Sequence, residues 1–121
     1  MATHSFRLPF PPSINSYWRE RVVKNGKKQF VSRYITSQGK EFHRDVTAAT
    51  RALWLTGRLA VSVSLVMPDR RKRDIDNSVK IILDAMGGAG VFNDDAQVDK
   101  LFVERLHVEP PGCADVTITE L

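Results

Sequence analysis

The chain has 121 residues, of which 42% are hydrophobic and 26% charged, and it carries a formal net charge of +4. This length fits one domain, and the mixture of charged and apolar residues excludes an intrinsically disordered chain. The single cysteine, Cys113, excludes an internal disulfide and a cysteine-based zinc site, and the lack of a membrane-length apolar run or a signal-like start predicts a cytoplasmic protein with no membrane partner.

The first third of the chain is predicted to form a strand, a loop and a hairpin. Phe6, Leu8 and Phe10 alternate on one side of the strand, and the proline-started segment PPSINSYW predicts a loop. Asn25-Gly26 then lies between apolar-rich arms, which is the strongest short hairpin signal because its turn positions need positive φ. The hairpin is basic, with lysines at three positions: Lys24, Lys27 and Lys28.

Residues 37–55 change to a helical period. An apolar stripe recurs at helical spacing along them, and Gly57 stands where a helix C-terminal glycine belongs. A basic stripe lies on the opposite face at the same spacing: Lys40, Arg44 and Arg51. Taken alone, this stripe is interpreted as a solvated face.

The second half of the chain alternates strands with one helix. Residues 59–67 alternate apolar and small polar side chains, residues 76–86 have helical apolar spacing that Gly87-Gly88 ends, and two further strands are expected near residues 100–108 and 114–120. The order predicts an α+β fold, in which one mixed or mostly antiparallel sheet carries two main helices. Residues 1–121 are taken as one domain.

The segment RKRDIDNSVKIILDA, residues 71–85, allows two interpretations. In the first, Asp76 caps the second helix and pairs with Lys80 one turn later, so the charges only stabilise the helix. In the second, Asp74 and Asp76 belong to a metal or phosphate site, because a cap needs one carboxylate and two stand here beside the basic run 70–73. The residues themselves leave both open.

A second acidic pair, Asp94-Asp95, precedes a strand and is either an exposed turn or the source of a third carboxylate. Three carboxylates offer hard oxygen ligands, which favour Mg²⁺ or Mn²⁺ over zinc and suit phosphodiester hydrolysis. Lys80 would then face phosphate charge or hold a carboxylate in place. The glycines of MGGAG follow a helix and precede no GKS or GKT, so no nucleotide cofactor is expected.

These two patterns together resemble the RusA-type Holliday-junction resolvases. RDIDNSVKIILDAM matches the family's R-x-D-x-D-N-x-x-K segment and its following D-A, AGVFNDDAQVDK matches its second acidic segment, and LPFPPSINSYWR is similar to its N-terminal segment. The resemblance therefore runs from end to end of the chain. Ser78 in place of leucine and the flexible pair Gly87-Gly88 are departures from the family pattern.

The resemblance implies a homodimer that uses Mg²⁺ to cut symmetric strands of four-way junction DNA, in recombination and repair. The essential carboxylates, which also ligate the metal, would be Asp74, Asp76 and Asp95, and the functional lysine would be Lys80. Two basic groups would bind DNA phosphates: Arg70, Arg71, Lys72 and Arg73, and the hairpin residues Lys24, Lys27 and Lys28. In this context, the stripe on the first helix also becomes a candidate DNA contact.

Two other functions remain open at this level. A DNA-binding module without catalysis would bind branched DNA with its aspartates serving only as caps and turns. A metal-dependent nuclease of a different preference would cut other branched or flap substrates.

Overall fold

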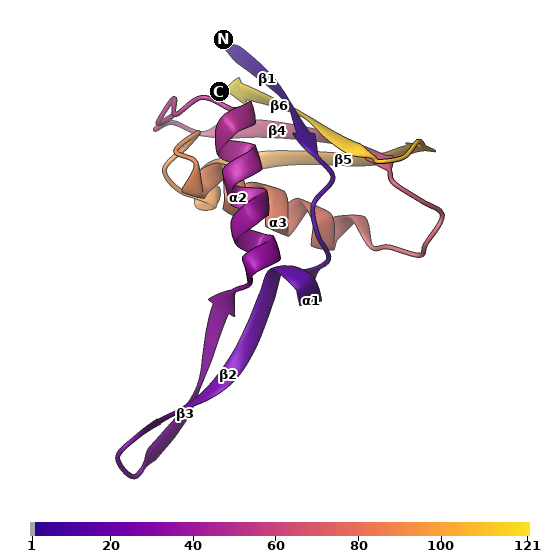
Figure 1. The fold of residues 1–121 in the computed structure, drawn as a ribbon. Coiled ribbons are helices and arrows are strands. Elements are labelled where there is room, and N and C mark those ends of the chain that lie inside the picture. The colour runs from indigo at the N-terminus through magenta and orange to yellow at the C-terminus, as the bar shows by residue number, and fades with distance from the viewer. Residues whose placement is uncertain (1) are drawn as a thin grey trace.

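The computed structural model describes residues 2–121 and has an α+β fold, as the sequence predicts (Figure 1). The elements follow one another in this order: β1 (Thr3–Pro9), α1 (Ile14–Tyr17), β2 (Trp18–Asn25), β3 (Lys28–Ile35), α2 (Ser37–Ala49), β4 (Leu59–Met67), α3 (Ile75–Gly88), η1 (Asp95–Gln97), β5 (Val98–Val108) and β6 (Cys113–Glu120). Among these residues, no helix is long and apolar enough to cross a membrane.

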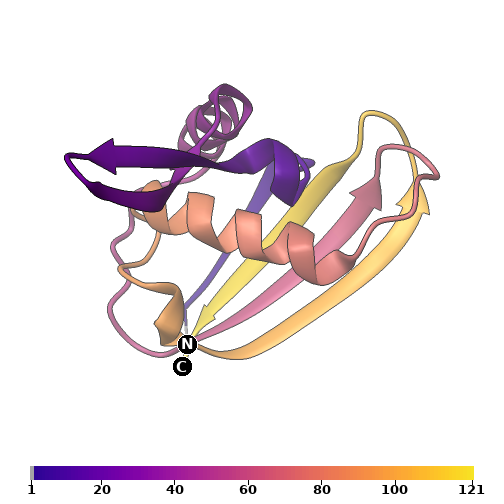
Figure 2. The same cartoon turned by 90° about the horizontal axis from the view of Figure 1, so that it is seen from below.

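Four strands form a mixed sheet in the order β1-β6-β4-β5, in which β4 and β5 run parallel and the other neighbours antiparallel. The alternation along β4 decides which face is buried, because Leu59, Val61, Val63, Leu65 and Met67 all point into one core. Helices α2 and α3 both pack on that face (Figure 2), and the serines of β4, which alternate with its buried residues, lie on the other. The sheet therefore has one face covered by helices and one open.

The hairpin β2–β3 is a separate two-stranded sheet that projects from the body, whereas the sequence predicts a single sheet (Figure 1). Its turn also differs by one residue from the prediction. Asn25 pairs with Lys28, so the two turn residues are Gly26 and Lys27, and only Gly26 has a positive φ, 63°. Glycine at the first turn position is the type II′ pattern, which needs one positive φ and not two.

The proline loop contains a short helix that the sequence does not predict. Ser13 caps α1 by accepting a hydrogen bond from the backbone N–H of Ser16 at 3.2 Å. The helix carries Tyr17 into the core, where it is fully buried. The backbone of α2 comes close at this point, since a Cβ on Gly39 would lie 2.8 Å from the carbonyl oxygen of Tyr17.

Helix α2 ends at Ala49, six residues before the predicted end, and Gly57 is not its C-terminal glycine. The chain instead turns through Trp54, with φ 50°, and runs beside the segment that follows α3. The backbone N–H of Leu55 donates to Val91 at 3.1 Å, and Leu55 is buried. The apolar residues beyond Ala49 thus reach the core through extended backbone, and Arg51 lies outside the basic helical stripe.

Helix α3 confirms the predicted helix and extends it at both ends, since it begins at Ile75 and includes Gly87 and Gly88. Its buried face is wider than the predicted stripe, because Ile81 and Ala85 are also fully buried. Its exposed side carries Asp76, Asn77 and Lys80, with Asp84 half-buried one turn further on. The core thereby fixes the direction in which these polar side chains point.

Candidate active site

The start of α3 holds the first two predicted carboxylates. Asp74 occupies the N-cap position with extended backbone, yet its side chain makes no capping hydrogen bond, and Asp76 lies in the first turn. Among residues 2–121, neither carboxylate has a hydrogen-bond or ion-pair partner. The capping interpretation of Asp76 is therefore wrong, and its i,i+4 pair with Lys80 is absent from these residues.

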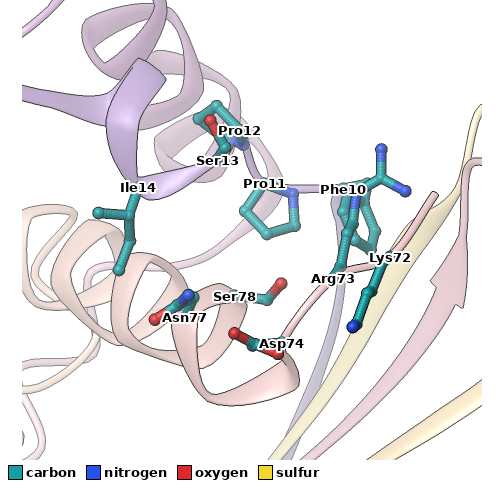
Figure 3. Close-up of a pocket in the computed structure, with 10 residues that line it drawn as sticks. All are labelled: Phe10, Pro11, Pro12, Ser13, Ile14, Lys72, Arg73, Asp74, Asn77 and Ser78. Atoms are coloured by element: carbon teal, nitrogen blue, oxygen red, sulfur yellow. The ribbon is translucent and has the colours of Figure 1, made fainter.

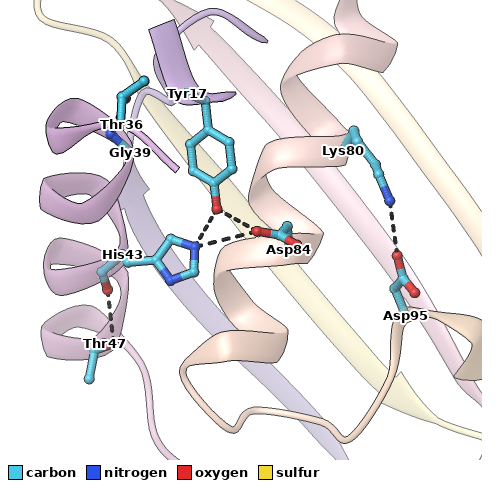
Figure 4. A network of polar contacts seen from close by, with 8 residues as sticks. All are labelled: Tyr17, Thr36, Gly39, His43, Thr47, Lys80, Asp84 and Asp95. Atoms are coloured by element: carbon cyan, nitrogen blue, oxygen red, sulfur yellow. Dashed lines mark hydrogen bonds and ion pairs between the residues drawn. The ribbon is translucent and has the colours of Figure 1, made fainter. Parts of the chain in front are cut away.

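Lys80 points to the other acidic segment instead. Its Nζ lies 3.4 Å from Oδ2 of Asp95, which belongs to η1 (Figure 4). Both side chains are about half exposed, with 55% and 41% of their surface accessible. An ion pair this exposed contributes little to the stability of the fold. What the contact shows is that η1 brings Asp95 next to the polar face of α3.

Asp94 and Asp95 are adjacent but have different tasks. Asp94 caps η1 by accepting a hydrogen bond from the backbone N–H of Ala96 at 2.9 Å, and this bond is the main cause that lowers the pKa of the Asp94 carboxyl below its ordinary value. With Asp94 turned toward the backbone, Asp95 is the member of the pair that faces α3.

Gln97 holds this acidic turn in place, and the sequence interpretation missed its role. Its side chain is buried, and its amide donates to the carbonyl oxygens of Leu55 and Gly57 at 2.9 and 2.8 Å. Its Oε1 accepts hydrogen bonds from the backbone N–H groups of Asn93 and Asp94, both at 2.8 Å. The only sequence signal was a glutamine three residues after an aspartate, which is the capping-box spacing.

A cleft of about 200 Å³ lies beside Asp74 (Figure 3). Asp74, Asn77 and Ser78 line it from α3, and the proline segment lines the facing wall with Pro11, Pro12 and Ile14. Pro11 is buried, and Tyr17 anchors the end of the same segment. The N-terminal loop therefore forms a rigid wall opposite the acidic end of the helix.

Two of the four basic residues before Asp74 are held by Asp69. Arg73 forms a two-pronged ion pair with Asp69, stacks 5.4 Å from the ring centre of Phe10, and its carbonyl accepts a hydrogen bond from Arg105. The backbone N–H of Arg71 also donates to Asp69, at 2.9 Å. Arg73 thus shapes the loop that delivers Asp74, and it is the least exposed of the four.

The Asp69–Arg73 pair predicts a pH effect on stability. The hydrogen bond from Arg73 and then that from the Arg71 backbone lower the pKa of the Asp69 carboxyl from 3.8 to about 2. A lowered folded-state pKa stabilises the fold above the ordinary pKa, and this stabilisation is lost as the pH falls toward about 2. We expect Asp69→Asn to lower the unfolding free energy near neutral pH, and we expect the unfolding free energies of variant and wild type to converge as the pH falls toward about 2. Urea unfolding across this range measures the difference, and a pH-independent gap would contradict the assignment.

A second polar cluster joins three helices below Lys80. The Tyr17 hydroxyl donates to Oδ2 of Asp84 and contacts Nε2 of His43, and His43 lies 3.4 Å from the same carboxylate oxygen (Figure 4). Burial, and then the bond to Asp84, raise the pKa of the Tyr17 hydroxyl far above its ordinary value, so it remains a donor. The cluster ties α1 and α2 to the polar side of α3. Nothing in the sequence spacing indicates it.

The remaining predicted cations are exposed, but the structure does not gather them at one point. Lys24, Lys27 and Lys28 lie at the tip of the projecting hairpin, Arg70 and Lys72 lie in the loop before α3, and Lys40 and Arg44 lie on α2.

The three predicted carboxylates have the chemistry of metal ligands but do not converge on one point. Among residues 2–121, no three His, Cys, Asp or Glu side chains converge closely enough to hold a metal ion by themselves. The donor chemistry nevertheless suits a hard cation, since Asp74 and Asp76 are unpaired oxygen donors and Asp95 is set opposite the same helix face by Gln97. The ligand set Asp74, Asp76 and Asp95 remains a prediction.

Sequence comparison relates the chain to one family. The profile of one family, described as Endodeoxyribonuclease RusA, matches residues 9–119. Two relatives share the name crossover junction endodeoxyribonuclease: one from Enterobacteria phage HK97 is 38% identical and one from Escherichia coli K12 is 35% identical, each over 100% of this chain and 98% of the relative. A protein of the same name from Shigella sonnei Ss046 is 37% identical over the same extent.

Proposed function

This chain belongs to the RusA family of endodeoxyribonucleases, and we propose that the acidic end of α3 is the centre at which it cuts junction DNA. The chain is a hydrolase, a crossover junction endodeoxyribonuclease that acts on Holliday junctions in recombination and repair. The observation that supports this site is the pair Asp74 and Asp76. Both lie at the start of α3, directly after a basic loop, yet neither side chain caps the helix or pairs with a cation.

Asp74, Asp76 and Asp95 would hold Mg²⁺, with Mn²⁺ able to replace it. The chemistry that such an ion supplies is a lower pKa for the attacking water and stabilisation of charge on the leaving oxygen. Hydrolysis joins the water oxygen to phosphorus and breaks one phosphorus–oxygen ester bond. The water loses a proton to a base or solvent, and the leaving oxygen takes up a proton and departs as a hydroxyl. Carboxylates are the right ligands for this task because they are charged, hard oxygen donors.

The chain's own side chains would orient the scissile phosphate. Lys80 carries a point charge at the end of a flexible side chain, on the same helix face as Asp76, and it is half exposed and lies 3.4 Å from Asp95. It can therefore turn from Asp95 toward a phosphate oxygen and oppose the charge that grows there. The wall formed by Pro11, Pro12 and Ile14 limits the room beside Asp74, which favours one approach of the strand.

The hairpin supplies a cationic and aromatic surface for DNA. One face of β2–β3 carries Arg19, Arg21, Lys28, Phe30 and Tyr34 without an acidic residue, because alternate residues of paired strands share a face. Arg21 stacks 5.4 Å from the ring centre of Tyr34, and Phe30 is 51% exposed. Cations and stacking rings on one ribbon suit the phosphates and unstacked bases of branched DNA.

The hairpin lysines predict the salt dependence of binding. The slope of log binding constant against log salt concentration is negative. Replacing Lys24, Lys27 and Lys28 with glutamine is expected to reduce its magnitude by about 3, since each phosphate contact contributes about 0.9. Fluorescence anisotropy with a labelled four-way junction, without divalent metal, measures the slope. An unchanged slope in a folded variant would show that the hairpin tip does not contact DNA phosphates.

A single experiment separates the proposed activity from its two alternatives. Labelled four-way, flap and duplex DNA are incubated with the protein in Mg²⁺, in Mn²⁺ and in a chelator. Paired, symmetric nicks in the four-way junction that need either metal support the proposal. Binding without nicks would indicate a non-catalytic module, and preferred cutting of flaps would indicate another nuclease specificity.

The proposed partner arrangement is a homodimer. One active site makes one cut, whereas resolution of a junction needs two cuts related by two-fold symmetry. A C2 dimer supplies two identical sites in that relation.

A further inference from the structure

The outer edge of β5 has the properties of a surface that another strand covers. Among residues 2–121, β5 pairs with β4 alone, so the hydrogen-bonding groups on its other side have no strand partner (Figure 2). Four large apolar side chains of this strand are exposed: Leu101 at 49%, Phe102 at 58%, Leu106 at 39% and Val108 at 43%. A long edge strand with exposed apolar side chains is a template for further pairing unless something covers it.

The opposite edge of the same sheet, β1, is protected against pairing with a further strand. Strand β1 exposes Thr3, Ser5 and Arg7, and Arg7 is paired with Asp115 at 2.8 Å. Its last residue is Pro9, which has no N–H to offer to another strand. The chain therefore blunts the β1 edge in the usual manner, whereas the β5 edge exposes four large apolar side chains among its charged ones.

We propose that β5 pairs antiparallel with β5 of a second copy of this chain and joins the two sheets into one of eight strands. The proposal rests on the homodimer of the preceding section and assigns its interface. A two-fold axis normal to the sheet generates antiparallel edge pairing, and it keeps each side chain opposite a residue on the same face. Even- and odd-numbered positions of β5 thus pair only among themselves.

The side chains select one register. With Phe102 opposite its own copy, Lys100 lies opposite Glu104 twice on the open face, and Leu101 lies opposite Val103 twice on the helix face. Opposite charges and apolar pairs directly across two strands are the favourable combinations. Glu104 is already held on the open face by the Ser64 hydroxyl, which donates to it at 2.8 Å.

Neighbouring registers are poorer. A two-fold at Val103 would place Phe102 opposite Glu104 and Leu101 opposite Arg105, and one at Glu104 would place two carboxylates together. The chosen register also uses the regular part of the strand, since Lys100 to Arg105 pair in step with β4 while irregularities lie on both sides.

This pairing would place the two active sites of the dimer on the same side of the joined sheet. The axis normal to the sheet leaves the helices of both copies on the same side, so both acidic α3 ends open onto one surface. A junction lying on that surface meets both sites at once. An axis in the plane of the sheet would place the two sites on opposite sides, where one junction does not reach both.

Charge reversal across the strand tests the register. Lys100→Glu and Glu104→Lys each place like charges opposite one another twice, so each variant alone is expected to have a dimer dissociation constant raised at least tenfold. The two variants mixed are complementary at both contacts and should form a heterodimer of near wild-type affinity. The double variant Lys100→Glu/Glu104→Lys should also recover the homodimer. Sedimentation velocity measures all four samples, with circular dichroism to show that each is folded.

Thr3→Asp adds a charge to the other edge of the sheet and should leave the dimer unchanged. Wild-type protein that sediments as a monomer, or single variants that remain dimers of wild-type affinity, would overturn the proposal. These readouts contain no DNA and no metal. A dimer with the expected charge pattern that lacks metal-dependent cleavage would overturn the proposed activity and leave the interface standing.

Discussion

Replacing Asp74, Asp76 or Asp95 with asparagine is expected to lower the rate of junction cleavage on the order of 10³-fold, with junction binding nearly unchanged. Asparagine keeps the size and one oxygen of the side chain but removes the charge that a divalent cation requires. Asp74 and Asp76 have no partner among residues 2–121, so the fold loses no contact with them. Single-turnover cleavage of a labelled junction measures the rate, and a chelator-treated gel shift measures the binding.

Asp94→Asn is the matched control for this series. It makes the same chemical change one residue from Asp95, and asparagine serves as well as aspartate at an N-cap, so η1 should keep its cap. Cleavage is therefore expected to remain close to wild type. If Asp94→Asn is as inactive as Asp95→Asn, or if the three other variants cut normally, the assignment of the carboxylates is wrong.

Replacing Gln97 with methionine is expected to lower the unfolding free energy by about 3 kcal/mol and to reduce cleavage as well. Methionine has a similar shape but satisfies none of the four backbone groups that the Gln97 amide bonds. Unsatisfied buried groups cost about 1–3 kcal/mol each, and part of that cost is relieved because water can reach the exposed Asp94 side of the turn. Urea unfolding and cleavage assays measure the two effects.

Gln97→Glu separates the two halves of this contact. Glutamate still accepts from the backbone N–H groups of Asn93 and Asp94 but no longer donates to Leu55 and Gly57. Its turn should keep its shape while losing its attachment to the segment after α2. Stability equal to wild type in the methionine variant would show that Gln97 does not hold the turn.

The periodic elements were predictable because burial on one face leaves a pattern in the chain. The alternation of Leu59, Val61 and Val63 and the helical spacing of Val79 and Ile82 both survive in the structure as core positions. The end of α2 was not predictable in this way. Leu53 continues the helical spacing but packs through irregular backbone, which depends on hydrogen bonds of the next residues to the segment after α3.

In the candidate site too, local features were predictable from the sequence and long-range contacts were not. The carboxylates at the start of α3 were found because two spaced motifs stand close together in the chain. The partner of Lys80 was not, because the local alternative, Asp76, has the favourable helical spacing and only the packing of η1 brings Asp95 nearer. Tyr17, His43 and Asp84 come together from three helices, so no short segment contains their relation.

The hairpin's separation from the main sheet has a consequence for how the chain opens in the native state. Its root is held where the backbone N–H of Thr36 donates to Tyr17 at 2.9 Å, while its outer pairs rest on two strands alone. A lone two-stranded ribbon is marginally stable, so its amide hydrogens should exchange with solvent through local fraying, whereas those of β4 exchange only when the whole chain unfolds. An arm of this kind can order itself against a bound substrate without any change in the core that carries the acidic helix.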